Sequence, residues 1–184
     1  MSPRIFTVPN QLTFLRLGFL PFLVITVLYE HFDWALGLLI AAALSDALDG
    51  FLARWLSQKT ALGAYLDPIA DKLMLSSAFF VLSLKAKISW WVTILVLSRD
   101  VLILAISLVI LLVFGYRLLP PTIYGKLCTG AQIVFVFLVV AVEVFANPLL
   151  AGGKTAFLYL VVGFTVFSGL HYSVIIARRL SSHT

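Results

Sequence analysis

Long apolar stretches, separated by short polar segments, recur along the whole chain. The six stretches cover residues 12–29, 34–55, 62–84, 89–114, 127–145 and 156–177. Each is long enough to cross a hydrocarbon core of about 30 Å as an α-helix. Helices are required there because an unpaired backbone group in hydrocarbon costs several kcal/mol. The pattern therefore predicts an all-α membrane bundle of six transmembrane helices, forming one domain over residues 1–184.

Two polar segments allow more specific predictions. Residues 2–16 mix apolar residues with arginines and polar side chains. The first part, about residues 2–11, is either a short interfacial segment along the membrane surface or an irregular lead-in to the first span. Residues 147–154 contain Pro148, Gly152 and Gly153, which predict a short loop.

Basic residues fall unevenly on the two sides that six spans define. Three basic residues fall in one set of loops: Lys85, Lys87 and Lys154. Eight flank the opposite ends of the spans: Arg4, Arg16, Arg54, Lys59, Arg117, Lys126, Arg178 and Arg179. Cytoplasmic segments carry the excess of Lys and Arg, so we expect both termini in the cytoplasm.

The composition agrees with a lipid environment. The chain is 62% hydrophobic and 11% charged, whereas soluble domains average about 45–50% and about 25%. The net charge of +5 is spread between apolar stretches, which argues against a nucleic-acid surface. The only cysteine, Cys128, lies in an apolar stretch and is predicted to be a buried, inert thiol.

Four of the eight acidic residues lie close together, around the second polar connection. Asp46 and Asp49 are three residues apart near the end of the second stretch, and Asp67 and Asp71 are four apart near the start of the third. Both spacings place two positions on one helical face. The short connection, residues 56–61, makes the two helices antiparallel neighbours. Their acidic ends are expected to meet near the cytoplasmic surface.

Four carboxylates at this depth need compensating positive charge. Their insertion costs roughly 10 kcal/mol at the membrane centre and less near its surface. Arg54 and Lys72 offset this only in part. Hard oxygen ligands without His or Cys favour Mg²⁺, Mn²⁺ or Ca²⁺, and two such ions suit four carboxylates and a phosphoryl substrate. The alternative is an ion-pair network that only ties the two helices together.

The same residues form a longer motif. Asp46, Asp49-Gly50, Ala53-Arg54, Gly63, Asp67 and Asp71 have the spacing D-x2-D-G-x2-A-R-x8-G-x3-D-x3-D. This spacing resembles, without departure, the motif of the CDP-alcohol phosphotransferase family. Eight fixed positions arise by chance at below roughly 10⁻⁸ per starting point. The six-stretch pattern extends the resemblance over nearly the whole chain.

The resemblance implies a usually dimeric six-helix membrane fold with a polar cavity open to the cytoplasm. Members of this family transfer a group from a CDP-linked donor, here CDP-diacylglycerol, to an alcohol and release CMP. At matching positions, Asp46, Asp49 and Asp67 would bind Mg²⁺ (or Mn²⁺), as two ions, and Asp71 would be the catalytic base and a further metal ligand. Gly50, Ala53, Arg54 and Gly63 would line the nucleotide site. Thr60 either contacts the nucleotide or simply lies in the loop.

The alcohol is less sharply defined. The segments PNQLTFLRL, ALGLLIAAALSDALDGFLAR, TALGAYLDPIADK and SRD look most like the CMP-forming cardiolipin synthase branch. The phosphatidylglycerophosphate synthase branch is similar, but it usually has Arg-Glu in place of Arg99-Asp100 and another Arg about two turns later. Residues 101–113 carry no charge here. We therefore expect phosphatidylglycerol as the acceptor, with glycerol-3-phosphate as the alternative and inositol-phosphate or serine as further ones.

Four residues outside the motif are candidates for binding this acceptor: Arg99, Asp100, Arg117 and Lys126. The simpler interpretation is that Arg99 and Asp100 neutralise each other or pair with the acidic cluster, and that Lys126 extends to the membrane surface. A divalent-cation transporter also has intramembrane acids. It would need polar groups along a path through the bilayer, whereas here the carboxylates collect at one end.

Overall fold

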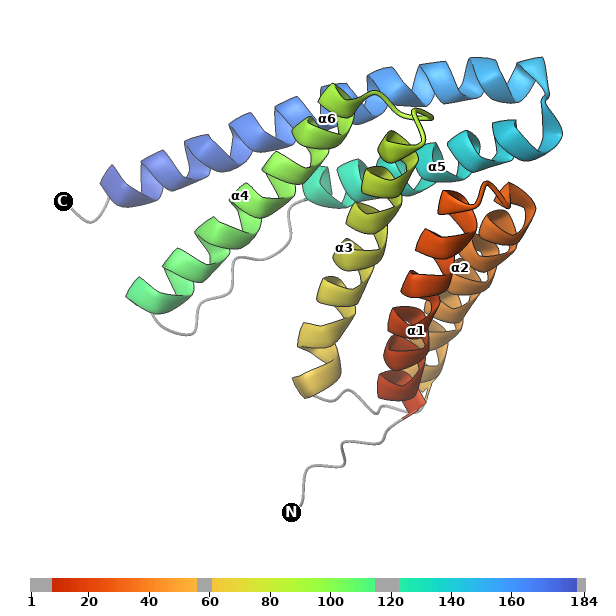
Figure 1. Cartoon of the computed structure of the whole chain (residues 1–184). Coiled ribbons are helices and arrows are strands. Elements are labelled where there is room, and N and C mark those ends of the chain that lie inside the picture. Colours follow the sequence, from red (N-terminus) through yellow and green to blue (C-terminus); the bar gives the residue numbers. More distant parts are fainter. Residues whose placement is uncertain (1–7, 56–60, 115–122, 182–184) are drawn as a thin grey trace. The chain divides into compact units, whose positions relative to one another are not determined.

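The computed structural model describes the backbone of residues 8–55, 61–114 and 123–181, and the side chains of residues 15, 17–45, 70–105 and 125–169. These described residues form six helices and no strand (Figure 1). The helices are α1 (Val8–Leu28), α2 (Phe32–Trp55), α3 (Ala61–Leu84), α4 (Trp90–Phe114), α5 (Ile123–Phe145) and α6 (Pro148–Ser181). The predicted all-α class is confirmed.

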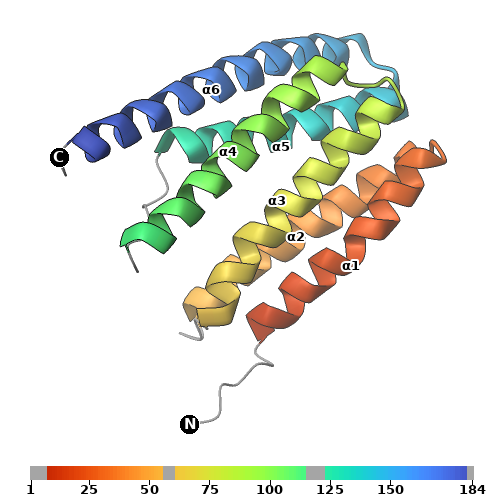
Figure 2. The same ribbon diagram turned by 60° about the vertical axis from the view of Figure 1, so that its left-hand side comes forward.

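The chain divides into two compact units. Unit 1 comprises Met1–Lys87 and Val140–Ala146, and unit 2 comprises Ile88–Val139 and Asn147–Thr184. In unit 1, α1 packs against both α2 and α3, and consecutive helices run in opposite directions (Figure 2). In unit 2, α4 packs against α6. Helix α5 lies in unit 2 except for its last turns, which belong to unit 1.

The core of unit 1 follows helical periodicity. The buried side chains recur every three or four residues along each helix. They include Leu23 and Val27 in α1, Ala35, Leu39 and Ala42 in α2, and Ala70, Met74, Ala78 and Val81 in α3. Four of these nine are alanines, whose small side chains let helix backbones approach closely, as in membrane bundles.

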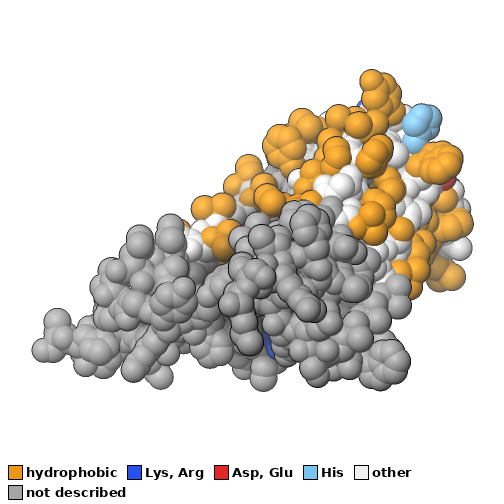
Figure 3. Space-filling view, turned by 90° about the horizontal axis from the view of Figure 1, so that it is seen from below, with side chains coloured by type: hydrophobic (Ala, Val, Ile, Leu, Met, Phe, Trp, Pro, Cys, Tyr) orange, Lys and Arg blue, Asp and Glu red, His pale blue; other side chains and the backbone are white. Residues whose placement is uncertain are grey.

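Large apolar side chains also cover much of the outside. Hydrophobic side chains dominate the described part of the face in Figure 3, and Trp34 and Leu149 are 69% and 83% exposed. Within the described residues, Gly125–Phe145 and Pro148–Gly169 are long and apolar enough to cross a membrane, judged by length and composition. Leu17–Leu28 and Phe32–Ser45 are shorter apolar helical segments. The arrangement of six spans stays a prediction.

Helices α1 and α3 end in the same backbone motif. Glu30 and Ala86, just past the two helix ends, have φ angles of 62° and 55°. In α3, the amide of Lys87 donates to the carbonyl of Leu82 (2.9 Å) and that of Ala86 to the carbonyl of Ser83 (3.0 Å). An equivalent pair of backbone bonds closes α1. Both are Schellman motifs, at whose left-handed position glycine is the usual residue.

Ion pairs join these helix ends to their neighbours within unit 1. Lys85 Nζ lies 2.5 Å from Glu30 Oε1, and Lys87 Nζ lies 2.5 Å from Glu143 Oε2 near the end of α5. Lys87 Nζ also lies 5.3 Å from the centre of the Phe32 ring. The hydrogen bond from Lys85, and then its charge, hold the pKa of Glu30 below its usual value. The α3–α4 connection therefore anchors two other chain segments.

The predicted loop over residues 147–154 is wrong, because α6 begins at Pro148. The amide of Leu149 donates to Asn147 Oδ1 at 2.8 Å. Asn147 is therefore an N-cap, and Pro148 occupies the first helical position, where a missing N–H costs nothing. Gly152 and Gly153 lie inside the helix.

Helix α1 includes the last part of the predicted interfacial segment. Helix α1 begins at Val8, so residues 8–11 of the proposed interfacial segment are helical. Residues 2–7 lie outside the described residues.

Candidate functional site

The acidic motif occupies two helices of unit 1, as predicted. Positions 46 and 49 lie in α2, and positions 67 and 71 lie in α3. The helical backbone places the members of each pair on one helical face. The C-terminal end of α2 and the N-terminal end of α3 lie at the same end of unit 1 (Figures 1 and 2). The connection between them, residues 56–60, lies outside the described residues.

The four positions can also be compared by their distance from those two helix ends. Position 49 is six residues before the end of α2, and position 67 is six residues after the start of α3. Both are therefore about 9 Å from their helix ends at about 1.5 Å per residue. Positions 46 and 71 are nine and ten residues from the same ends, or about 14–15 Å. The aspartate positions of the two helices thus lie at similar distances from the helix ends that share one end of unit 1.

The side-chain detail of this region begins at Ala70. Asp71 is exposed, next to the buried Ala70 and one turn before the buried Met74. The side chains at positions 46, 49, 53, 54 and 67 lie outside the described set, and Thr60 lies outside the described backbone. Gly50 and Gly63 lie in α2 and α3. Their predicted roles at the nucleotide site stay predictions.

The chemistry of the motif fits a divalent ion. Aspartates at these four positions would offer only hard oxygen ligands, which Mg²⁺ and Mn²⁺ prefer. Among the described side chains, no three His, Cys, Asp or Glu residues gather. Three of the four aspartates lie outside that set.

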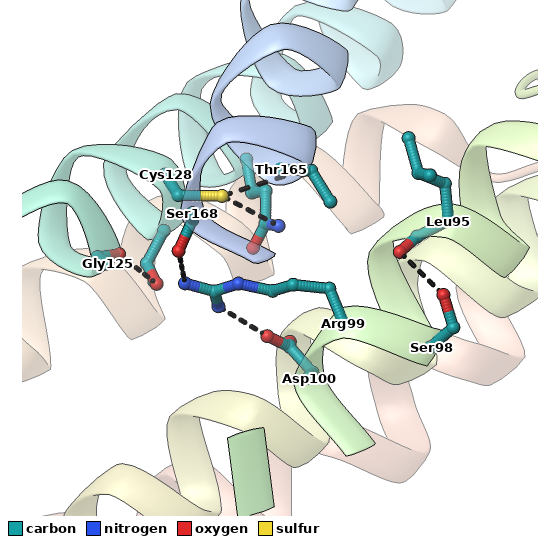
Figure 4. A network of polar contacts seen from close by, with 10 residues as sticks. Leu95, Ser98, Arg99, Asp100, Gly125, Cys128, Thr165 and Ser168 are labelled. Atoms are coloured by element: carbon teal, nitrogen blue, oxygen red, sulfur yellow. Dashed lines mark hydrogen bonds and ion pairs between the residues drawn. The ribbon is translucent and has the colours of Figure 1, made fainter. Parts of the chain in front are cut away.

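Unit 2 contains a second polar group, at Arg99 and Asp100 of α4. Arg99 Nη1 donates to Asp100 Oδ1 at 2.7 Å, and Arg99 Nη2 donates to Ser168 Oγ of α6 at 2.8 Å (Figure 4). Arg99 and Asp100 are only 7% and 6% exposed. The ion pair between Arg99 and Asp100, one of the two simpler interpretations, is therefore present. A role in acceptor binding stays a prediction.

The polar group continues across α5 and α6. Cys128 Sγ lies 3.5 Å from Thr165 Oγ1, and Gln132 Nε2 donates to the same sulfur at 3.5 Å. All three residues are buried, so the prediction of a buried Cys128 is confirmed. Sequence reasoning missed Gln132, Thr165 and Ser168. The available signal was spacing: positions 128 and 132 are four apart, and positions 165 and 168 are three apart, in predominantly apolar parts of their helices.

The other two acceptor candidates are less well defined. Lys126 is exposed near the start of α5. Arg117 lies outside the described residues.

Comparison with known proteins identifies the family. Residues 6–168 match the family model described as CDP-alcohol phosphatidyltransferase. The chain belongs to the CDP-alcohol phosphatidyltransferase family. The resemblance inferred from the eight-position motif is thus confirmed over most of the sequence.

Relatives of the chain include proteins named for different acceptors. The chain is 36% identical to "Cardiolipin synthase (CMP-forming)" of Rattus norvegicus, over 76% of this chain and 51% of that protein. It is 32% identical to "Probable phosphatidylglycerophosphate synthase" of Mycobacterium tuberculosis, over 96% and 83%. It is 43% identical to "CDP-diacylglycerol--glycerol-3-phosphate 3-phosphatidyltransferase" of Salmonella choleraesuis, over 55% and 58%. The chain thus spans about half the length of the rat synthase.

Proposed function

We propose that this chain transfers the phosphatidyl group of CDP-diacylglycerol to an alcohol and releases CMP. The feature that supports the proposal is the complete eight-position motif on α2 and α3, with its aspartate positions at similar distances from two helix ends that lie at the same end of unit 1. Membership of the CDP-alcohol phosphatidyltransferase family supports it.

Four aspartates would hold the metal in this proposal: Asp46, Asp49, Asp67 and Asp71. When bound, two Mg²⁺ (or Mn²⁺) ions would neutralise negative charge on the pyrophosphate and on the departing CMP. Gly50 and Ala53 are three apart on α2, so their small side chains would let the nucleotide approach the helix. Arg54 offers a planar fork of N–H donors that suits phosphate oxygens. Gly63 and Thr60 would complete the nucleotide site.

In the proposed chemical step, Asp71 is the general base. Its carboxylate would take the proton of the acceptor hydroxyl as the hydroxyl oxygen attacks the phosphorus that bears diacylglycerol. The bond from that phosphorus to the CMP oxygen breaks, and CMP leaves with the electron pair. The products are the new phosphodiester, CMP and one proton. No covalent enzyme intermediate is required.

The proposed acceptor is phosphatidylglycerol, which would yield cardiolipin. The charge of Arg99 is already balanced by Asp100, and residues 101–113 carry no charge. This pair suits a singly charged phosphodiester better than a doubly charged phosphate monoester. The alternative acceptor is glycerol-3-phosphate, which the name of the Salmonella relative specifies. In either case Arg99, with Asp100, Arg117 and Lys126, would contact the acceptor.

The membrane arrangement is part of the same proposal. Six spans would place both termini in the cytoplasm, with the acidic end of α2 and α3 facing a cytoplasmic cavity, in a homodimer. Cys128 is buried, so the chain gives a low background for labelling with a thiol reagent. We expect His31→Cys to react with an impermeant maleimide from outside intact cells and Ser182→Cys only after permeabilisation. The reverse pattern would refute the orientation.

A direct assay tests the reaction. Purified protein in detergent with Mg²⁺, CDP-diacylglycerol and phosphatidylglycerol should release CMP and form cardiolipin, and EDTA should abolish both. Asp71→Asn should lose turnover while retaining donor binding. Asp33→Asn, a matched change at the opposite end of α2, should leave turnover unchanged. Absence of CMP with phosphatidylglycerol, glycerol-3-phosphate, inositol-phosphate and serine would refute the function, and preference for glycerol-3-phosphate would reassign the acceptor.

A further inference from the structure

Two buried polar atoms in unit 2 have no hydrogen-bond partner among the described residues. One is Arg99 Nε, which carries a hydrogen to donate, and the other is Gln132 Oε1, which can only accept. Gln132 is completely buried. Buried polar groups in native proteins are almost always paired, so each such atom calls for an explanation.

The two atoms belong to two hydrogen-bonded groups that both end on α6. Arg99 reaches Ser168 at 2.8 Å, and Gln132 reaches Thr165 through the sulfur of Cys128 in two steps of 3.5 Å. Thr165 and Ser168 are three apart on α6, so they lie on one helical face within about 6 Å of each other. Figure 4 shows Arg99, Ser168, Cys128 and Thr165 meeting where α4, α5 and α6 come together.

The chemistry of the two atoms restricts what joins them. An anionic oxygen would accept from Arg99 Nε but would be repelled by the carbonyl oxygen of Gln132. A metal cation would suit that carbonyl oxygen but would be repelled by the guanidinium. Only a group that both accepts and donates a hydrogen bond satisfies both atoms. A neutral O–H group does this.

We propose that a single O–H group bridges Arg99 Nε and Gln132 Oε1, and that Gln132 is thereby a positioning residue for Arg99. The O–H group belongs either to an internal water molecule or to the secondary hydroxyl of the acceptor, since both have the required chemistry.

The bridge fixes the plane of the guanidinium. Asp100 holds Nη1, Ser168 holds Nη2, and the bridge holds Nε. Three anchors on one planar group define its orientation, and each Nη atom keeps a second N–H for another acceptor atom. This step rests on the proposed function, in which Arg99 contacts the acceptor substrate.

Substitution of Gln132 tests the positioning role. Gln132→Met keeps the size of the side chain but removes Oε1, and we expect the KM for the acceptor to rise about tenfold. We expect the kcat and the KM for CDP-diacylglycerol to change less than about twofold. Gln132→Glu retains an oxygen acceptor near Arg99 and should restore most of the acceptor KM. Thr129→Val is the matched control on α5, because within the described part of the chain the Thr129 hydroxyl donates to the Gly125 carbonyl of its own helix.

A second acceptor identifies the O–H group. Phosphatidylpropanediol keeps the attacking primary hydroxyl of phosphatidylglycerol but lacks the secondary one. If the effect of Gln132→Met persists with this acceptor, the bridge is an internal water. If the effect disappears, the bridge is the secondary hydroxyl of the acceptor. Both results support the proposal, whereas an unchanged acceptor KM in Gln132→Met overturns the positioning role.

A measurement without turnover separates this inference from the proposed function. Thermal unfolding of Arg99→Met, Gln132→Met and the double variant forms a double-mutant cycle. A bridged pair gives non-additive shifts, because the second substitution removes a partner already lost. Additive shifts both in the protein alone and in the presence of phosphatidylglycerol overturn the bridge even if the enzyme is active. Non-additive shifts in a chain that turns over no acceptor support the bridge and refute the proposed reaction alone.

Discussion

Replacing Lys87 with methionine removes the partner of Glu143 and should destabilise unit 1 measurably. Lys87 Nζ lies 2.5 Å from Glu143 Oε2, and the two side chains are 28% and 23% exposed. The ammonium also lies 5.3 Å from the centre of the Phe32 ring. The substitution therefore leaves a largely enclosed carboxylate without its nearest cation.

The exposure of the pair determines the size of the effect. Fully exposed pairs contribute about 0.2–1 kcal/mol, whereas removal of one member of a fully buried pair costs about 3–5 kcal/mol. A pair about three-quarters enclosed falls between these limits, at about 2 kcal/mol. For a chain of this length each kcal/mol shifts Tm by about 2–4 °C. Lys87→Met should therefore lower the unfolding midpoint by about 4–8 °C.

The assay is thermal unfolding of the detergent-solubilised protein, followed by intrinsic tryptophan fluorescence. Lys85→Met is the matched control, because its partner Glu30 has a side chain that is 58% exposed, and its shift should be clearly smaller. Glu143→Gln in the Lys87→Met background should recover part of the loss, because no unpaired charge then remains. Equal shifts for the two lysine variants, or no recovery in the double variant, would refute the reasoning.

Three further outcomes follow from the loops of the described fold. Ala86→Gly should stabilise the protein by about 1 kcal/mol, because glycine adopts the positive φ of 55° without a steric penalty. We expect Tm to rise by about 2–4 °C. A lower Tm would contradict this prediction. Asn147→Ala should cost about 1 kcal/mol through loss of the 2.8 Å bond to the Leu149 amide, and Asn147→Ser should retain most of it. The lowered pKa of Glu30 means that its ionised form favours the folded state. That contribution is present above the usual pKa of glutamate and is lost as pH falls through the lowered value, so Lys85→Met should weaken the dependence of Tm on pH in this acidic range.

The helix boundaries were largely predictable because the polar segments between the apolar stretches coincide with the helix ends. The predicted stretches 34–55, 62–84 and 89–114 agree with α2, α3 and α4 to within two residues at each end. Helix α6 begins eight residues before its predicted start. The breakers Pro148, Gly152 and Gly153 predicted a loop there, but an Asn-Pro pair can equally start a helix. The N-cap hydrogen bond of Asn147 distinguishes a helix start from a loop. The residue types alone do not.

The positions of the acidic residues could be predicted from the sequence, whereas the contacts of Arg99 could not. The aspartates lie at local spacings on two consecutive helices, so helical periodicity and one short connection were enough to place them at one end. The contacts of Arg99 with Ser168 and of Cys128 with Thr165 join residues 69 and 37 positions apart. They depend on which faces of α4, α5 and α6 meet. No single-helix pattern contains that information.

Helix α6 has 34 residues, so it is about 51 Å long at about 1.5 Å per residue. The hydrocarbon interior of a bilayer measures about 30 Å, and a tilt of about 20° shortens the vertical reach of the helix only slightly. With Pro148 at the outer surface, as proposed, the final turns must emerge from the lipid as a rigid rod. The distance of positions 178 and 179 from the membrane surface is then fixed by the length of the helix, because both positions are part of it.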